Sequence, residues 1–162
     1  MSSPAAALYY FLGLRILWNI AENTPGRFRR LSSVFCVSGA AFMTGVSHIL
    51  LTGLYGPALN IISVILLGVF WGRVFSVFAG GDFFPEFSTL GAGGALLASE
   101  YGVTPGASFL FFGYLSGGYF VAAALFLPVY ASLNRKAHPY FRGIPVMLII
   151  LGLLTLLLKG WV

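Results

Sequence analysis

Two clusters of polar side chains interrupt an otherwise apolar chain, and these clusters hold the groups that could do chemistry. Arg15, Asn19 and Glu22 are spaced by four and three residues, so a helix places them on one face. Charged groups inside a membrane span normally face a protein interior or a watery cavity. We therefore expect Arg15, Asn19 and Glu22 to face the interior of the bundle or a watery cavity. The alternative is that Arg15 and Glu22 reach the membrane surface and pair there.

The second cluster contains Arg73, Asp82 and Glu86, around a break at Gly80-Gly81. Carboxylates can donate or accept protons, and a guanidinium can bind phosphate or a lipid headgroup through paired N–H groups. These three residues are the predicted catalytic candidates. The alternative is a structural salt bridge between Arg73 and one of the two acids.

The remaining reactive side chains are too few for a metal site. Cys36 is the only cysteine, Asp82 is the only aspartate, and His48 and His138 are the only histidines. We predict no metal site, and we exclude aspartyl protease chemistry because it requires two aspartates. His48 lies within an apolar stretch, so we expect it to hydrogen-bond across a helix interface.

The stretch from Arg15 to Pro25, which begins Arg15-Ile-Leu-Trp-Asn19-Ile-Ala-Glu22, resembles a known signature. It is similar to the Arg-x3-Asn-x2-Glu pattern of the membrane-associated glutathione and eicosanoid enzymes. The resemblance implies glutathione binding by Arg15, Asn19 and Glu22. This chain departs from the family in one respect, because the family carries the signature in its second of four helices and here it lies in the first apolar stretch.

A second stretch runs from Gly68-Val-Phe-Trp-Gly72-Arg-Val-Phe-Ser76 through Gly80-Gly81 to Pro85. It resembles the Gly-Arg-x-x-Ser…Gly-x-Pro pattern of an uncharacterised family of small polytopic integral membrane proteins. That family has no assigned activity, so the resemblance implies a membrane location and no reaction. No cofactor is indicated apart from the glutathione of the first resemblance.

The composition explains where these clusters must sit. Of 162 residues, 59% are hydrophobic and 8% are charged, whereas roughly a quarter are charged in an ordinary soluble domain. This balance excludes most soluble, disordered and disulfide-stapled classes. The net charge of +5 comes from basic residues in short loops, which favours membrane headgroups over nucleic acid as a partner. We predict a single all-α transmembrane helical bundle over residues 1–162.

Charge placement predicts the topology of the bundle. Loops 22–31 and 134–143 carry most of the basic residues, so both are expected to be cytoplasmic. An even number of crossings must then lie between residues 80 and 134, which requires the short stretch 84–103 to cross. We predict six spans, and the alternative is five spans with a re-entrant segment. The apolar stretches lie at 1–21, 32–54, 57–79, 84–103, 108–133 and 144–158.

These features support three functional hypotheses. The first is a structural or accessory membrane subunit that binds membrane lipid, a partner subunit or a second copy of itself. Its binding faces would be rows of small residues, which let helices approach closely. The second is a small membrane-embedded enzyme that acts on a lipophilic substrate with acids as proton donors or acceptors. The third is a small oligomeric transporter or channel. The small-residue rows are Gly68, Gly72, Ser76, Gly80 and Gly113, Gly117; the candidate acids are Glu22, Asp82, Glu86 and Glu100.

Overall fold

The structure is a computed structural model that describes residues 4–56, 60–79 and 84–159. These residues form six α-helices and one short 3-10 turn, which confirms the predicted all-α class. The elements are α1 (Pro4–Asn23), α2 (Arg27–Tyr55), α3 (Asn60–Ala79), α4 (Phe84–Glu100), α5 (Pro105–Lys136), η2 (Pro139–Phe141) and α6 (Ile144–Lys159).

Glycine and proline mark the helix boundaries. Gly26 separates α1 from α2 with φ of 81°, and Gly56 follows α2 with φ of 79°. A positive φ is costly for residues with a Cβ atom, so glycine favours a chain reversal at both positions. Pro105 occupies the first turn of α5, where the missing N–H costs nothing.

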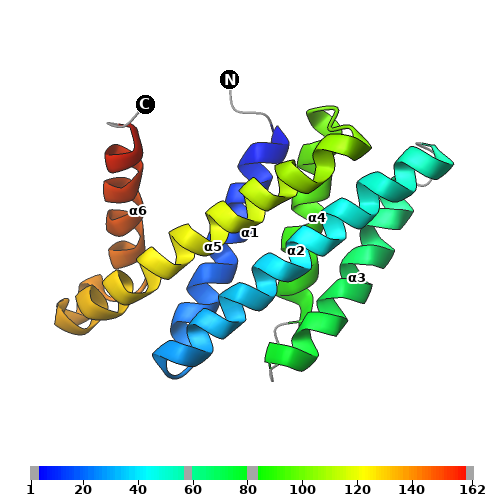
Figure 1. Cartoon of the computed structure of the whole chain (residues 1–162). Coiled ribbons are helices and arrows are strands. Elements are labelled where there is room, and N and C mark those ends of the chain that lie inside the picture. Colours follow the sequence, from blue (N-terminus) through cyan, green and yellow to red (C-terminus); the bar gives the residue numbers. More distant parts are fainter. Residues whose placement is uncertain (1–3, 57–59, 80–83, 160–162) are drawn as a thin grey trace.

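Successive helices run in opposite directions through the bundle. The connection from α1 to α2 and the C-terminal end of α5 both lie at the lower end in Figure 1, whereas the connection from α4 to α5 lies at the upper end. The two predicted basic loops therefore meet at one end. Parts of these loops are helical, because α2 begins at Arg27 and α5 continues to Lys136.

Helix α4 lies inside the bundle, in contact with α1, α2, α3 and α5. Its glycines make this possible: a Cβ at Gly91 would lie 2.8 Å from the Thr44 side chain, and one at Gly93 would lie 3.1 Å from Leu12. Leu90, on the same helix, is fully buried. The short stretch 84–103, for which the alternatives are a crossing and a re-entrant segment, contains one continuous helix of 17 residues, about 25 Å long.

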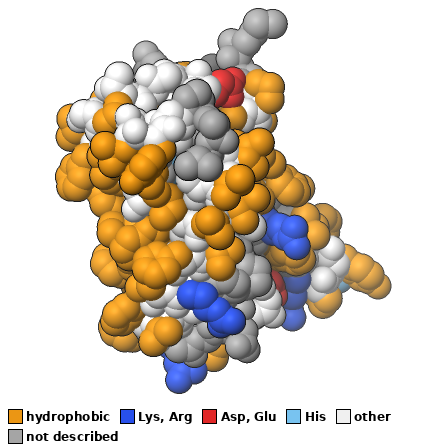
Figure 2. Space-filling view, turned by 90° about the vertical axis from the view of Figure 1, so that its right-hand side faces the viewer, with side chains coloured by type: hydrophobic (Ala, Val, Ile, Leu, Met, Phe, Trp, Pro, Cys, Tyr) orange, Lys and Arg blue, Asp and Glu red, His pale blue; other side chains and the backbone are white. Residues whose placement is uncertain are grey.

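Within the part of the chain that the structure describes, three helices are long and apolar enough to cross a membrane, namely Arg27–Tyr55, Ile61–Ala79 and Pro105–Lys136. Much of their outward surface is apolar. Figure 2 shows hydrophobic side chains over most of one face, with basic side chains gathered in its lower half. Exposed large apolar residues on α3 and α5 include Ile61, Ile65, Leu66, Phe70, Val77, Phe109, Leu110, Val121 and Leu125.

Candidate functional site

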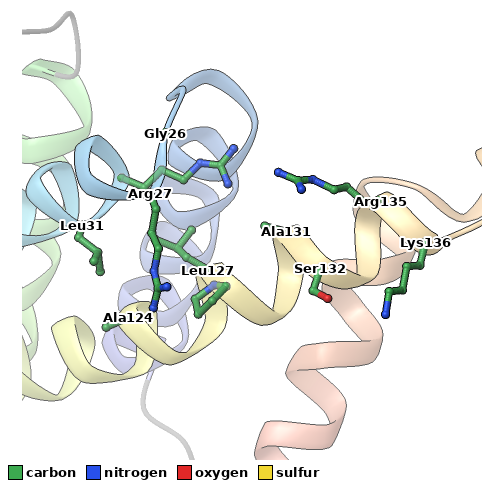
Figure 3. Close-up of a pocket in the computed structure, with 11 residues that line it drawn as sticks. Gly26, Arg27, Leu31, Ala124, Leu127, Ala131, Ser132, Arg135 and Lys136 are labelled. Atoms are coloured by element: carbon green, nitrogen blue, oxygen red, sulfur yellow. The ribbon is translucent and has the colours of Figure 1, made fainter.

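A pocket of about 580 Å³ lies between the start of α2 and the C-terminal part of α5. Its walls come from two segments that are about a hundred residues apart in the sequence. Figure 3 shows this arrangement, with Arg27 on one side of the opening and Arg135 on the other. The lining residues are Gly26, Arg27, Arg30, Leu31, Ala124, Leu127, Pro128, Ala131, Ser132, Arg135 and Lys136.

One face of α5 supplies most of the wall. Its lining residues recur every three or four positions from Ala124 to Lys136, as the period of a helix requires. The first of them are apolar, including Leu127 and the ring of Pro128, and the last two are basic. The pocket thus has an apolar part and a basic part along one helix axis.

The basic part carries four cations, Arg27, Arg30, Arg135 and Lys136, and none of the lining residues is acidic. Within the described ranges, no carboxylate forms an ion pair with any of the four. Arg135 extends from α5 toward the start of α2, whereas Lys136 points away from it (Figure 3). The result is a concentration of positive charge between two helices.

Arg30 is held in place by the connection between α1 and α2. Its Nε donates a hydrogen bond to the carbonyl oxygen of Thr24, at 2.8 Å. A guanidinium has five N–H donors, so this bond fixes the side chain and leaves other donors for a ligand. Arg30 is therefore the best-positioned cation of the pocket.

A carboxylate and a phenol join α1 to α5 beside the pocket. The Tyr130 hydroxyl donates a hydrogen bond to Oε1 of Glu22. Tyr130 is 2% exposed, and Arg30 lies near enough to interact electrostatically with its hydroxyl. This contact connects the predicted ligand residue Glu22 to the pocket wall without making it part of the lining.

The other two predicted ligand residues lie elsewhere on α1. Arg15 is exposed, and Asn19 is half-buried and accepts a hydrogen bond from the Asn23 side chain. Neither Arg15 nor Asn19 lines the pocket. Their role as a ligand set with Glu22 stays a prediction.

The predicted catalytic cluster is only partly described. Arg73 lies exposed on α3, and its carbonyl accepts a hydrogen bond from the Ser76 hydroxyl at 2.8 Å. Asp82 lies outside the described residues, and so does the side chain of Glu86, whose backbone belongs to the first turn of α4. Their pairing with Arg73 therefore stays a prediction.

The two histidines have different surroundings. His48 is fully buried on α2, and its Nδ1 lies 2.8 Å from Oγ of Ser63 on α3. This hydrogen bond confirms the expected contact across a helix interface. His138, in the basic segment after α5, stacks on Tyr140 with ring centroids 5.2 Å apart. Among the described residues, no three His, Cys, Asp or Glu side chains come close enough to hold a metal ion.

Sequence reasoning used the basic residues as topology markers and missed that four of them line a pocket. The available signal was the spacing of small and apolar residues before Arg135, which marks one face of α5. That signal does not say which other helix faces it. The start of α2 lies there because α2 packs along α5.

Comparisons of the chain with family models, with curated proteins and with solved structures gave no significant match.

Proposed function

We propose that this chain is a multi-pass membrane protein with six crossings, and that it acts as a structural or accessory subunit that binds lipid or a partner chain. The observation that carries this proposal is that the basic residues of two distant segments lie at one end of an apolar helical bundle. Basic residues favour the cytoplasmic side of a membrane. We accordingly assign both basic segments to the cytoplasmic surface.

The lengths of the shorter helices are compatible with six crossings. α1 has 20 residues and α6 has 16, which correspond to about 30 Å and 24 Å. The hydrocarbon core of a bilayer is about 30 Å thick. α4 falls between them in length and is surrounded by other helices, so lipid need not match its ends closely.

The small-residue rows differ in their surroundings, and this difference suggests where a partner would bind. A Cβ at Gly68 of α3 would lie 3.2 Å from the Ser88 carbonyl oxygen, so this row packs inside the bundle. A Cβ at Gly113 or Gly117 of α5 would meet nothing within 4 Å. We propose the Gly113–Gly117 face as the contact for a partner helix or a second copy.

Cysteine labelling tests the topology. Cys36 is the only native cysteine, so Cys36→Ala gives a clean background. Single cysteines at Arg29 and Tyr140 should react with an impermeant maleimide from one side of sealed membranes, and cysteines at Tyr55 and Tyr101 should react from the other. All four parent residues are exposed. Labelling of positions 29 and 140 from opposite sides would contradict the proposal.

The partner face has its own matched test. Gly117→Leu should lower the fraction of associated chains, measured as mass in mild detergent, because a large side chain keeps a second helix at a distance. Gly118→Leu is the control, since Gly118 is also exposed but lies on another face of α5. Equal effects of both substitutions would remove the assignment of this face.

A membrane-embedded enzyme acting on a lipophilic substrate is the second candidate function. The Glu22–Tyr130 hydrogen bond beside a partly apolar pocket favours it, because a carboxylate can transfer protons to a bound substrate. Its predicted catalytic residues are still Arg73, Asp82 and Glu86. Under this hypothesis Glu22→Gln abolishes lipid turnover in membranes while assembly is retained; under the accessory role it changes no lipid pool.

A further inference from the structure

We infer that the pocket between α2 and α5 binds the phosphate-bearing headgroup of an anionic phospholipid, with an acyl chain along its apolar part. The inference rests on the proposed membrane location and deepens it by naming the ligand class and the residues that hold it.

The charge of the pocket fits a phosphate. Three of its four cations are arginines, namely Arg27, Arg30 and Arg135. A guanidinium binds phosphate through two parallel N–H groups and keeps its charge at all physiological pH values. No lining residue is acidic, so a bound phosphate meets no carboxylate in the pocket lining.

The apolar part of the pocket fits an amphiphile better than free phosphate. Leu31, Ala124, Leu127 and Pro128 supply hydrocarbon surface next to the cations. A free phosphate ion would leave this surface unused. A phospholipid places its charge and its hydrocarbon in the same order as the two parts of the pocket.

The position of the pocket along α5 matches the depth of a headgroup. α5 has 32 residues and is about 48 Å long, which exceeds the bilayer core of about 30 Å. If the first turn of α5 lies at one surface, roughly the last twelve residues extend beyond the core on the other side. The lining residues of α5 start at Ala124 and end at Lys136, so they begin where the hydrocarbon core ends and continue into the headgroup region.

The test uses the full chain in mild detergent, with retained lipid measured by native mass spectrometry. The chain is offered phosphatidylglycerol or phosphatidylcholine with identical acyl chains. The double variant Arg135→Gln and Lys136→Gln should lower phosphatidylglycerol retention about tenfold, since the pocket loses two of its four positive charges. The control double variant Arg29→Gln and Arg142→Gln removes the same charge from residues outside the pocket.

Each outcome decides the inference. Selective retention of phosphatidylglycerol that falls in the pocket variant and persists in the control supports it. Equal loss in both variants, equal retention of both lipids, or displacement of the lipid by inorganic phosphate overturns it. If circular dichroism shows that the pocket variant is misfolded, Ser132→Glu replaces it, because it adds a negative charge to the same wall. This variant should also lose selective retention of phosphatidylglycerol, and unchanged retention would overturn the inference. The topology test above is independent, so a six-span result without lipid binding refutes only this inference.

Discussion

The two halves of α5 lie in different surroundings within one continuous helix. In the first half, Phe112 is 1% exposed and packs so closely on α2 that a Cβ at Gly45 would lie 2.1 Å from its ring. In the second half, one face of the helix borders the basic pocket, and another packs against α6 through Val146 and Ile150. The first half therefore closes tightly on α2, whereas the second half buries Phe126 and Tyr130 on one side and leaves space for a ligand on another.

Overpacking the contact between α2 and the first half of α5 should cost the most stability. Gly45→Ala places a methyl group into the Phe112 ring, which cannot move easily because it is enclosed with Ile49 and Ala98. Such overpacking costs typically about 2 kcal/mol. We expect a clear loss of thermal stability in detergent, measured by the temperature at which the monodisperse fraction falls by half.

Gly117→Ala is the control for this experiment. Gly117 is exposed on α5, the helix that carries Phe112, and a Cβ there meets nothing within 4 Å. Alanine has a helix propensity about 1 kcal/mol better than glycine, so the control should be unchanged or slightly more stable. A Gly45→Ala protein as stable as Gly117→Ala would refute the tight packing of the first half.

An intermediate effect is expected where the second half is anchored to α1. Tyr130→Phe removes the hydroxyl that donates to Glu22. A hydrogen bond to a charged group contributes about 1.5–3 kcal/mol when buried, and the exposure of Glu22 places the expected loss at about 1 kcal/mol. Tyr114→Phe is the control, because Tyr114 is 80% exposed. Equal stability of the two variants would mean that this contact does not anchor α5.

The smallest loss of stability is expected at the exposed cations of the second half of α5. Arg135→Gln combined with Lys136→Gln should change thermal stability by less than about 0.5 kcal/mol, since both side chains are exposed and have no described acidic partner. The same variant is expected to lose lipid retention. A large stability loss in lipid-free detergent would show that these cations support the fold instead of a ligand.

Composition and charge placement predicted the helical class and the common end of the two basic segments. Few charges and long apolar stretches leave helices as the structure that satisfies the backbone in lipid. The sequence could not distinguish the Gly68–Gly72 row from the Gly113–Gly117 row, because both have a spacing of four. Which row packs inside depends on the neighbouring helix, and Ser88 of α4 occupies that place only for Gly68.

The short stretch 84–103 was ambiguous for a related reason. Its glycines and alanines weaken a hydropathy signal, yet they are what allow α4 to lie among α1, α2, α3 and α5. The pocket was missed because it combines one face of α5 with the start of α2. A sequence shows each face by its period but not which two faces meet.

The proposed topology places the start of α2 and the C-terminal end of α5, which are distant in the sequence, at one membrane surface. Cysteines in place of Arg27 and Arg135, in the Cys36→Ala background, test it most directly, because both positions line one pocket. We predict that an impermeant, short bis-maleimide joins them within one chain when added from the cytoplasmic side only. Reaction of the two cysteines from opposite sides, or reaction of both without a cross-link, would contradict the account.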